Sequence, residues 1–193
     1  REDRSAGTLI SLRPPSRSLL PTYQRWHNDV ATLRTYPLPL PTTHEQEEAL
    51  FSALTADPNL VLFTIYERST GRPIGTTYLT DIDHQQRCAE FGILIGETAY
   101  RGKGYGAEVT RLMRNYAFAR LGLHSLMLTV YEYNLAGRRA YAKAGFRDVA
   151  RRRQHGAPLQ LLPPKGAKAV RSRAGILRSK TSFFPKHGNS RGT

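Results

Sequence analysis

Alternating apolar and polar positions predict six strands in this chain, and apolar positions at helical spacing predict four helices between them. The strands are expected at residues 8–13, 60–68, 73–79, 88–95, 125–131 and 146–150. The helices are expected to begin near residues 19, 42, 105 and 134. Because strands and helices are mixed along the chain without an internal repeat, the pattern indicates a mixed α/β fold.

Turn and capping residues set the expected ends of these elements. Ser18 is expected to cap the first helix, and Thr42–Glu45 has the spacing of a capping box at the start of the second. Ser69–Arg72 predicts the turn of a β-hairpin, and Asp81–His84 predicts a polar turn. Gly145 is the expected left-handed end of the last helix.

A glycine-rich stretch, Arg101-Gly-Lys-Gly-Tyr-Gly-Ala107, follows the strand at 88–95 and precedes the third helix. Glycine lets a backbone approach a ligand closely, and the first turn of a helix offers unpaired N–H groups with a partial positive charge. The stretch therefore predicts a site for a cofactor that carries a pyrophosphate. Its expected contacts are Arg101, Gly102, Lys103, Gly104, Tyr105, Gly106 and Ala107.

Several phosphate-loop patterns compete for this stretch. The Walker pattern Gly-x4-Gly-Lys-Ser/Thr is absent. A dinucleotide fingerprint fits Gly102, Gly104 and Ala107. That fingerprint follows the first strand of a βαβ unit and requires an acidic residue about 20 residues later. Residues 123–131, which lie at that distance, contain no Asp or Glu. A third pattern, Arg/Gln-x-x-Gly-x-Gly/Ala, fits the segment from Arg101 to Gly106. A tight turn that binds nothing is the remaining alternative.

Charge is distributed unevenly along the 193 residues, whose net charge is +14. Residues 151–193 hold 11 Lys and Arg and no Asp or Glu, whereas residues 1–150 have a net charge of only +3. We therefore expect one domain over residues 8–150 and a basic tail, 151–193, that is disordered or non-native.

The single cysteine, Cys88, excludes an intramolecular disulfide and a Cys-based zinc cluster, and no other spacing suggests a metal. No apolar run has the length of a membrane span, and the N-terminal residues lack the apolar segment of a signal peptide. The expected compartment is the cytoplasm.

Two motifs in order resemble the GNAT acetyltransferases, which bind acetyl-coenzyme A. The first is the loop from Arg101 to Gly106, and the second, about 28 residues later, runs from Asn134 through Tyr141 to Gly145-Phe146. Stretches at 25–29, 70–75 and 89–95 resemble the branch that includes ribosomal-protein N-terminal acetyltransferases and spermidine acetyltransferases. The resemblance covers about residues 8–150.

The resemblance implies a mixed, mostly antiparallel sheet flanked by helices, on which acetyl passes from acetyl-coenzyme A to an amine without a covalent enzyme intermediate. It also implies that the strand around Ile93 and Ile95 splays from its neighbour and pairs with the pantetheine arm of the coenzyme. A backbone N–H there would polarise the thioester carbonyl. The further residues expected to contact the coenzyme are Ile93, Leu94, Ile95 and Asn134.

Two residues are candidates for proton transfer. Tyr141 matches the tyrosine that the family places near the leaving thiolate, and its alternative role is that of a core tyrosine. Glu90 is the candidate base, because it lies on the strand face opposite Phe91, and its alternative role is that of an ion-paired surface glutamate. Asn134 is equally a plain helix cap.

Three residues near the first helix, Trp26, Asn28 and Asp29, are expected by analogy to line the acceptor pocket. The alternative is that Trp26 belongs to the core and that the two polar residues cap a turn. The acceptor is expected to be a protein N-terminus first and a polyamine or small-molecule amine second, because a body charge of +3 does not indicate a strongly anionic groove.

The family pattern stops after Arg153, and the final hairpin that completes the sheet is expected to be missing, with only Leu159–Leu162 able to form a short strand. The tail is either a basic extension that contacts RNA or another polyanion, or a non-native C-terminus, which we favour. The alternative function is therefore a catalytically weak module that binds nucleic acid through its tail, and a dehydrogenase is a minor third option. The chain is expected to be a monomer or a homodimer, without a membrane partner.

Overall fold

The computed structural model describes residues 8–33, 42–147, 150–154 and 157–161. Its larger sheet has five strands in the order β1-β2-β3-β4-β5. All neighbours in this sheet are antiparallel except β4 and β5, which are parallel, so the predicted mixed and mostly antiparallel sheet is confirmed. The strands are β1 (Ile10–Arg13), β2 (Val61–Glu67), β3 (Pro73–Asp83), β4 (Cys88–Ile95) and β5 (Ser125–Met127).

A smaller sheet of three strands lies beside it, in the order β6-β8-β7. It consists of β6 (Thr129–Tyr131), β7 (Ala150–Gln154) and β8 (Ala157–Leu161). The single strand predicted at 125–131 is therefore wrong: the chain leaves the first sheet at Leu128, and β6 pairs with β8. The alternation of apolar residues continues through this break because Leu126, Leu128 and Val130 are all buried, so the sequence pattern did not reveal it.

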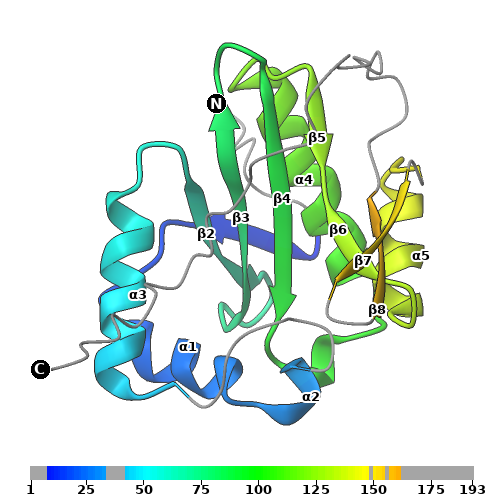
Figure 1. The fold of residues 1–193 in the computed structure, drawn as a ribbon. Coiled ribbons are helices and arrows are strands. Elements are labelled where there is room, and N and C mark those ends of the chain that lie inside the picture. The colour runs from blue at the N-terminus through cyan, green and yellow to red at the C-terminus, as the bar shows by residue number, and fades with distance from the viewer. Residues whose placement is uncertain (1–7, 34–41, 148–149, 155–156, 162–193) are drawn as a thin grey trace, which may run out of the picture.

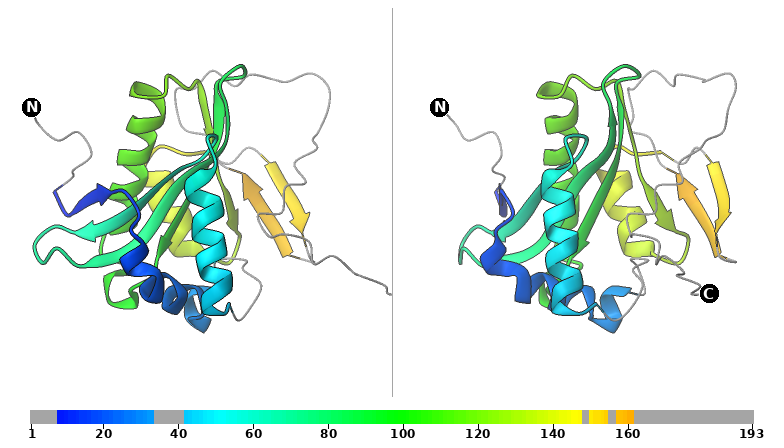
Figure 2. Two further views of the ribbon diagram at one scale, coloured as in Figure 1. Left: turned by 90° about the vertical axis from the view of Figure 1, so that its left-hand side faces the viewer. Right: turned by 60° about the vertical axis from the view of Figure 1, so that its left-hand side comes forward.

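Helices cover both faces of the larger sheet (Figure 1, Figure 2). Helices α4 and α5 lie on one face, and α1 and α3 lie on the other. The helical segments are η1 (Arg17–Leu19), α1 (Leu20–His27), α2 (Val30–Leu33), α3 (His44–Ala56), η2 (Thr98–Tyr100), α4 (Tyr105–Ala119) and α5 (Leu135–Lys143). No helix in these described ranges is long and apolar enough to cross a membrane.

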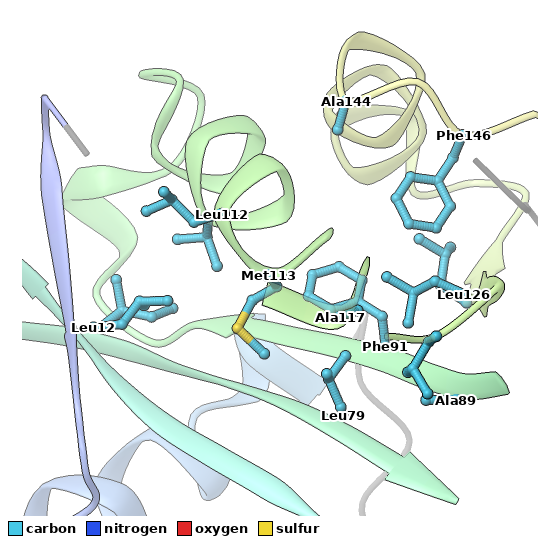
Figure 3. Packing of buried hydrophobic residues seen from close by; sticks show 14 of the residues in the cluster. Leu12, Leu79, Ala89, Phe91, Leu112, Met113, Ala117, Leu126, Ala144 and Phe146 are labelled. Atoms are coloured by element: carbon cyan, nitrogen blue, oxygen red, sulfur yellow. The ribbon is translucent and has the colours of Figure 1, made fainter. Parts of the chain in front are cut away.

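Two apolar clusters fill the spaces between these layers. The larger one lies on the α4 and α5 side, where Phe91, Met113 and Ala117 meet between sheet and helix (Figure 3). The smaller one, on the α1 and α3 side, includes Trp26 and Leu94. Phe91 and Leu94 thus point to opposite faces of β4, as the alternation in its sequence predicts.

Some predicted element ends moved by a few residues. The capping box begins at Thr43, whose hydroxyl accepts from the amide of Gln46 while the Gln46 side chain accepts from the amide of Thr43. Ser16, rather than Ser18, is the capping serine, and it caps η1. Strand β3 continues to Asp83, so the polar turn starts later than predicted. Gly145, with φ at 95°, ends α5 as predicted.

A hairpin does follow α5, so the expectation that the sheet lacks its final hairpin is wrong. Strands β7 and β8 pair along their whole length, from Ala150↔Leu161 to Gln154↔Ala157, and β8 also pairs with β6. The predicted strand at Leu159–Leu162 thus overlaps β8, which begins two residues earlier, and Leu162 lies outside the described residues. The division of the chain at residue 150 stays a prediction, and residues 162–193 lie outside the described residues.

Candidate active site

Strands β4 and β6 part from each other at the centre of the fold and are not paired, and we call the separation of their backbones the gap (Figure 1). Strand β4 pairs with β5 only from Cys88↔Ser125 to Glu90↔Met127. Beyond Glu90, β4 pairs with β3 alone, while the chain after β5 turns away to join β8. The predicted splay of this strand is therefore present, and Glu90 lies where it begins.

Backbone groups of β4 line this gap at alternate residues. The carbonyl of Gly92 accepts from the Thr77 hydroxyl of β3 at 2.9 Å, and a methyl group on Gly75 of β3 would stand only 2.0 Å from the carbonyl oxygen of Leu94. These even-numbered residues thus direct their carbonyls toward β3. Because successive residues of a strand alternate, the N–H and C=O groups of Phe91 and Ile93 face the gap.

Leu94 is consequently less suited to a coenzyme contact than the sequence suggested. Its backbone carbonyl lies against β3, and its side chain is buried in the cluster with Trp26. The carbonyl of Ile95 accepts a hydrogen bond from the Arg101 side chain at 2.9 Å. Of the three residues predicted on this strand, Ile93 presents its backbone to the gap most directly.

The glycine loop lies between the end of β4 and the start of α4. Gly102 and Gly104 have φ angles of 76° and 92°, which favour glycine, and Gly104 is the N-cap of α4. The amides of Gly102–Gly106 donate no hydrogen bond to any residue that the structure describes. A Cβ on Gly102 would meet nothing within 4 Å, so the loop is open to a ligand.

The two ends of the predicted loop are already bonded within the protein. The amide of Ala107 donates to the carbonyl of Gly104 at 3.1 Å, and the amide of Arg101 donates to Thr98 at 3.1 Å. The Arg101 side chain donates to the hydroxyl of Thr32 at 2.6 Å as well as to Ile95. Its guanidinium thus braces the loop, and the amides between the two ends remain for a phosphate.

Helix α5 places Tyr141 beside the gap on the α4 side of the sheet. The Tyr141 ring meets the Phe91 ring edge to face, with centroids 6.2 Å apart, and the side chain is half-buried. Asn134 caps α5 by accepting from the amide of Gly137 at 2.9 Å, as predicted. The position of Tyr141 next to the splayed residue Phe91 is compatible with proton donation into the gap.

Glu90 lies on the opposite face of β4, and its side chain is half-buried. The hydroxyl of Thr129, the first residue of β6, donates to the Glu90 carboxylate at 3.0 Å and so bridges the point where the strands part. Thr80 and Met127 are its cross-strand neighbours, and Met127 is 42% exposed. Glu90 therefore lies next to an exposed side chain on this face of the sheet.

Sequence reasoning missed Tyr78, which lies on this same face. It is directly opposite Gly92 in the pairing of β3 with β4. A Cβ on Gly92 would stand 2.1 Å from the Tyr78 ring, so the ring rests on the bare backbone of that glycine. The strand register, which sequence alone did not provide, is the signal that pairs these two residues.

The residues predicted to line the acceptor pocket have structural partners. Trp26 is 1% exposed and donates through Nε1 to Glu97 at 2.8 Å. Asn28 accepts from the amide of Thr42 at 2.8 Å and so fastens the end of α1 to the start of α3. Asp29 accepts from the amide and hydroxyl of Thr32, and the bond from that hydroxyl is the main cause that lowers the Asp29 pKa. A role in acceptor binding stays a prediction for all three.

An open hollow of about 250 Å³ lies elsewhere, between α1, the start of β3 and η2. Its lining residues are Thr22, Arg25, Arg72, Pro73, Glu97 and Tyr100. None of the predicted catalytic or coenzyme residues is among them, so we place the active site at the gap instead. Across the described residues, no group of His, Cys, Asp and Glu is arranged to hold a metal ion.

Comparison with known proteins identifies relatives by sequence. The chain is 37% identical over 76 residues to spermidine N(1)-acetyltransferase of Escherichia coli strain K12, which is 39% of this chain and 40% of that protein. It is also 37% identical over 84 residues to the probable N-acetyltransferase YjcK of Bacillus subtilis strain 168, which is 44% of this chain and 46% of that protein. The matched region thus spans less than half the length of either relative.

Solved structures share the fold at lower sequence identity. Spermidine N-acetyltransferase from Vibrio cholerae, in complex with CoA and spermine, superposes with a TM-score of 0.74 at 20% identity, over 81% of this chain and 95% of that one. A domain from Methanocaldococcus jannaschii superposes with a TM-score of 0.68 at 19% identity, over 80% and 97% of the two chains.

A family model, that of the acetyltransferase (GNAT) domain, matches residues 10–147. This range contains the splayed strand, the glycine loop and Tyr141, and it covers more than half of the chain. The resemblance seen in the sequence is confirmed, and this protein belongs to the GNAT acetyltransferases, the family that uses acetyl-coenzyme A as acetyl donor.

Proposed function

We propose that this protein is an N-acetyltransferase that moves the acetyl group of acetyl-coenzyme A directly to a primary amine. The observation that carries the proposal is the gap between β4 and β6, which opens at Glu90 and leads along β4 to the glycine loop. A gap between two strands that ends at unpaired amides fits a long, thin ligand with a pyrophosphate near one end.

The chain's own groups would hold the donor in three places. The amides of Gly102–Gly106 would bind the pyrophosphate, with the exposed Lys103 as a nearby cation. The backbone groups of Phe91 and Ile93 would pair with the pantetheine arm as a neighbouring strand does. One of these two N–H groups would donate to the thioester oxygen and stabilise the negative charge that develops there.

Glu90 projects from one face of β4, and Tyr141 packs on Phe91 at the other face. This arrangement suits direct attack by an amine. Glu90 would take the proton that an ammonium group must lose before its nitrogen attacks. As the C–N bond forms and the C–S bond breaks, Tyr141 would give its phenolic proton to the departing thiolate. The nitrogen of the new amide would release its second proton to solvent, from which Tyr141 would recover one. The step needs no covalent intermediate on the protein.

The relatives help to choose an acceptor for the first assays. Two proteins similar to this chain are named for spermidine, and one of them was solved with spermine. We therefore put a polyamine before a protein N-terminus, which reverses the order expected from the body charge. No observation on the described residues favours nucleic-acid binding as the function.

The proposal is tested by following thiol release from acetyl-coenzyme A while mass spectrometry identifies the acetylated product. Spermidine and a short peptide with a free N-terminus are the two acceptors, and Tyr141→Phe is the comparison variant. We expect acetylspermidine from the wild type and far less from the variant. If the folded protein binds acetyl-coenzyme A but acetylates no amine, the proposed function is wrong.

A further inference from the structure

An aromatic residue of β3, Tyr78, lies on the same face of the sheet as Glu90, and the strand register fixes their spacing. Tyr78 and Gly92 are directly paired across β3 and β4, and Thr80 and Glu90 are the next pair on the same face. Two such pairs are separated by two residues along the strand, which is about 7 Å. The Tyr78–Gly92 pair therefore lies about one diamine length along the strands from the pair that contains Glu90.

The orientation of the Tyr78 ring follows from its contact with Gly92. A Cβ on Gly92 would stand 2.1 Å from Cζ, 2.4 Å from Cε2 and 2.4 Å from the hydroxyl oxygen of Tyr78. The outer half of the ring thus lies over the glycine, with one face against the backbone and the other directed away from the sheet. Any side chain at position 92 would displace it, and Tyr78 itself is only half-buried.

An aromatic face of this kind attracts cations. The negative face of the ring interacts favourably with an ammonium group within about 6 Å. Extended carbon chains have bonds near 1.5 Å, so two nitrogens joined by four carbons are about 6 Å apart. A diamine whose reacting nitrogen lies at Glu90 would therefore bring its second ammonium over the Tyr78 ring.

We infer that Tyr78 determines acceptor specificity, by binding the second ammonium of a diamine whose reacting nitrogen lies at Glu90. Met127, exposed on β5 opposite Glu90, would contact the methylene groups from the other side. The inference rests on the proposed function, and it names the acceptor as an alkyl diamine with a spacer of about four carbons. A monoamine lacks the second charge and gains nothing from the ring.

The test compares 1,4-diaminobutane with butylamine in steady-state kinetics. Tyr78→Leu keeps an apolar side chain but removes the aromatic face, whereas Tyr78→Phe keeps the face. We expect Tyr78→Leu to raise KM for the diamine about 5- to 30-fold, with kcat nearly unchanged and the butylamine KM unaffected. Tyr78→Phe and the control Thr76→Val, the next residue on the same face of β3, should stay within about threefold of wild type.

Equal effects of Tyr78→Leu on both amines, or no effect on either, would overturn the inference. A binding experiment separates this failure from that of the proposed function. The complex of the protein with CoA is titrated with 1,4-diaminobutane while the Tyr78 ring resonances are followed by NMR. Shifts that saturate, together with weaker binding by Tyr78→Leu, support the site even if no acetyl transfer is found. Unshifted Tyr78 resonances contradict it.

Discussion

The guanidinium of Arg101 donates a hydrogen bond to the hydroxyl of Thr32, with 2.6 Å between Nη2 and Oγ1. The same guanidinium donates through Nε to the carbonyl of Ile95 at 2.9 Å. One side chain thus joins helix α2, the end of the splayed strand and the start of the glycine loop. The loop keeps its shape because of contacts outside it, which leaves its backbone amides as the proposed ligands of the phosphates.

Substitution Thr32→Val tests this brace without touching the loop. It leaves the guanidinium without its hydroxyl acceptor, and a hydrogen bond to a charged group contributes about 1.5–3 kcal/mol. We expect a stability loss of that order in urea titration and a several-fold weaker affinity for acetyl-coenzyme A by calorimetry. Thr42→Val is the matched control, because it removes the hydroxyl bonded to Asn28 and should lower stability alone. Equal affinities of both variants would contradict the brace.

Gly104→Ala tests the amides at the start of α4. The residue has φ at 92°, where a Cβ costs about 1–2 kcal/mol, so the loop would rearrange or remain strained. We expect the affinity for acetyl-coenzyme A to fall about 10-fold or more, since bonds to a charged pyrophosphate are lost. Gly71→Ala carries a similar strain, with φ at 67° in the β2–β3 turn. The Gly71→Ala variant should bind acetyl-coenzyme A with the affinity of the wild type. A comparable loss of affinity in Gly71→Ala would mean that backbone strain alone explains the effect of Gly104→Ala.

Tyr141→Phe tests the leaving-group acid. Removal of a general acid lowers kcat by about 100-fold or more, and KM for both substrates should change little because the ring still packs on Phe91. Tyr116→Phe is the control, since Tyr116 is a half-buried tyrosine packed edge to face on Phe63 with centroids 5.4 Å apart. Similar kcat values for the two variants would remove Tyr141 from the mechanism.

Acid stability is expected to depend on Glu67 at the β2–β3 turn. Its carboxylate accepts bonds from the hydroxyls and amides of Thr70 and Ser69, and the Thr70 hydroxyl is the largest cause that lowers the Glu67 pKa from 4.5 to about 2. A lowered pKa in the folded state stabilises the protein above the unfolded pKa, and this stabilisation is lost as pH falls through the folded one. Wild type should therefore exceed Glu67→Gln in stability at pH 7, and the difference should shrink between about pH 5 and pH 2. Parallel stability curves over that range would contradict the assignment.

Local signals were enough to predict the loop, the caps and most strands. The alternation at 88–95 placed Glu90 and Phe91 on opposite faces, and the glycines placed the N-terminus of α4 at Tyr105. Contacts between distant residues were not predictable in the same way. The brace from Arg101 to Thr32 and the packing of Tyr78 on Gly92 depend on which strands and helices become neighbours. The break at Leu128 was hidden because the buried apolar positions Leu126, Leu128 and Val130 continue to alternate through it.

The central claim is that the gap and the glycine loop bind acetyl-coenzyme A. Calorimetric titration of the whole chain with acetyl-coenzyme A and, separately, with NADH tests it most directly. We predict binding of acetyl-coenzyme A with a dissociation constant in the micromolar range, about −8 kcal/mol, and no binding of NADH. A folded protein that bound neither ligand, or that bound NADH in preference, would contradict the claim.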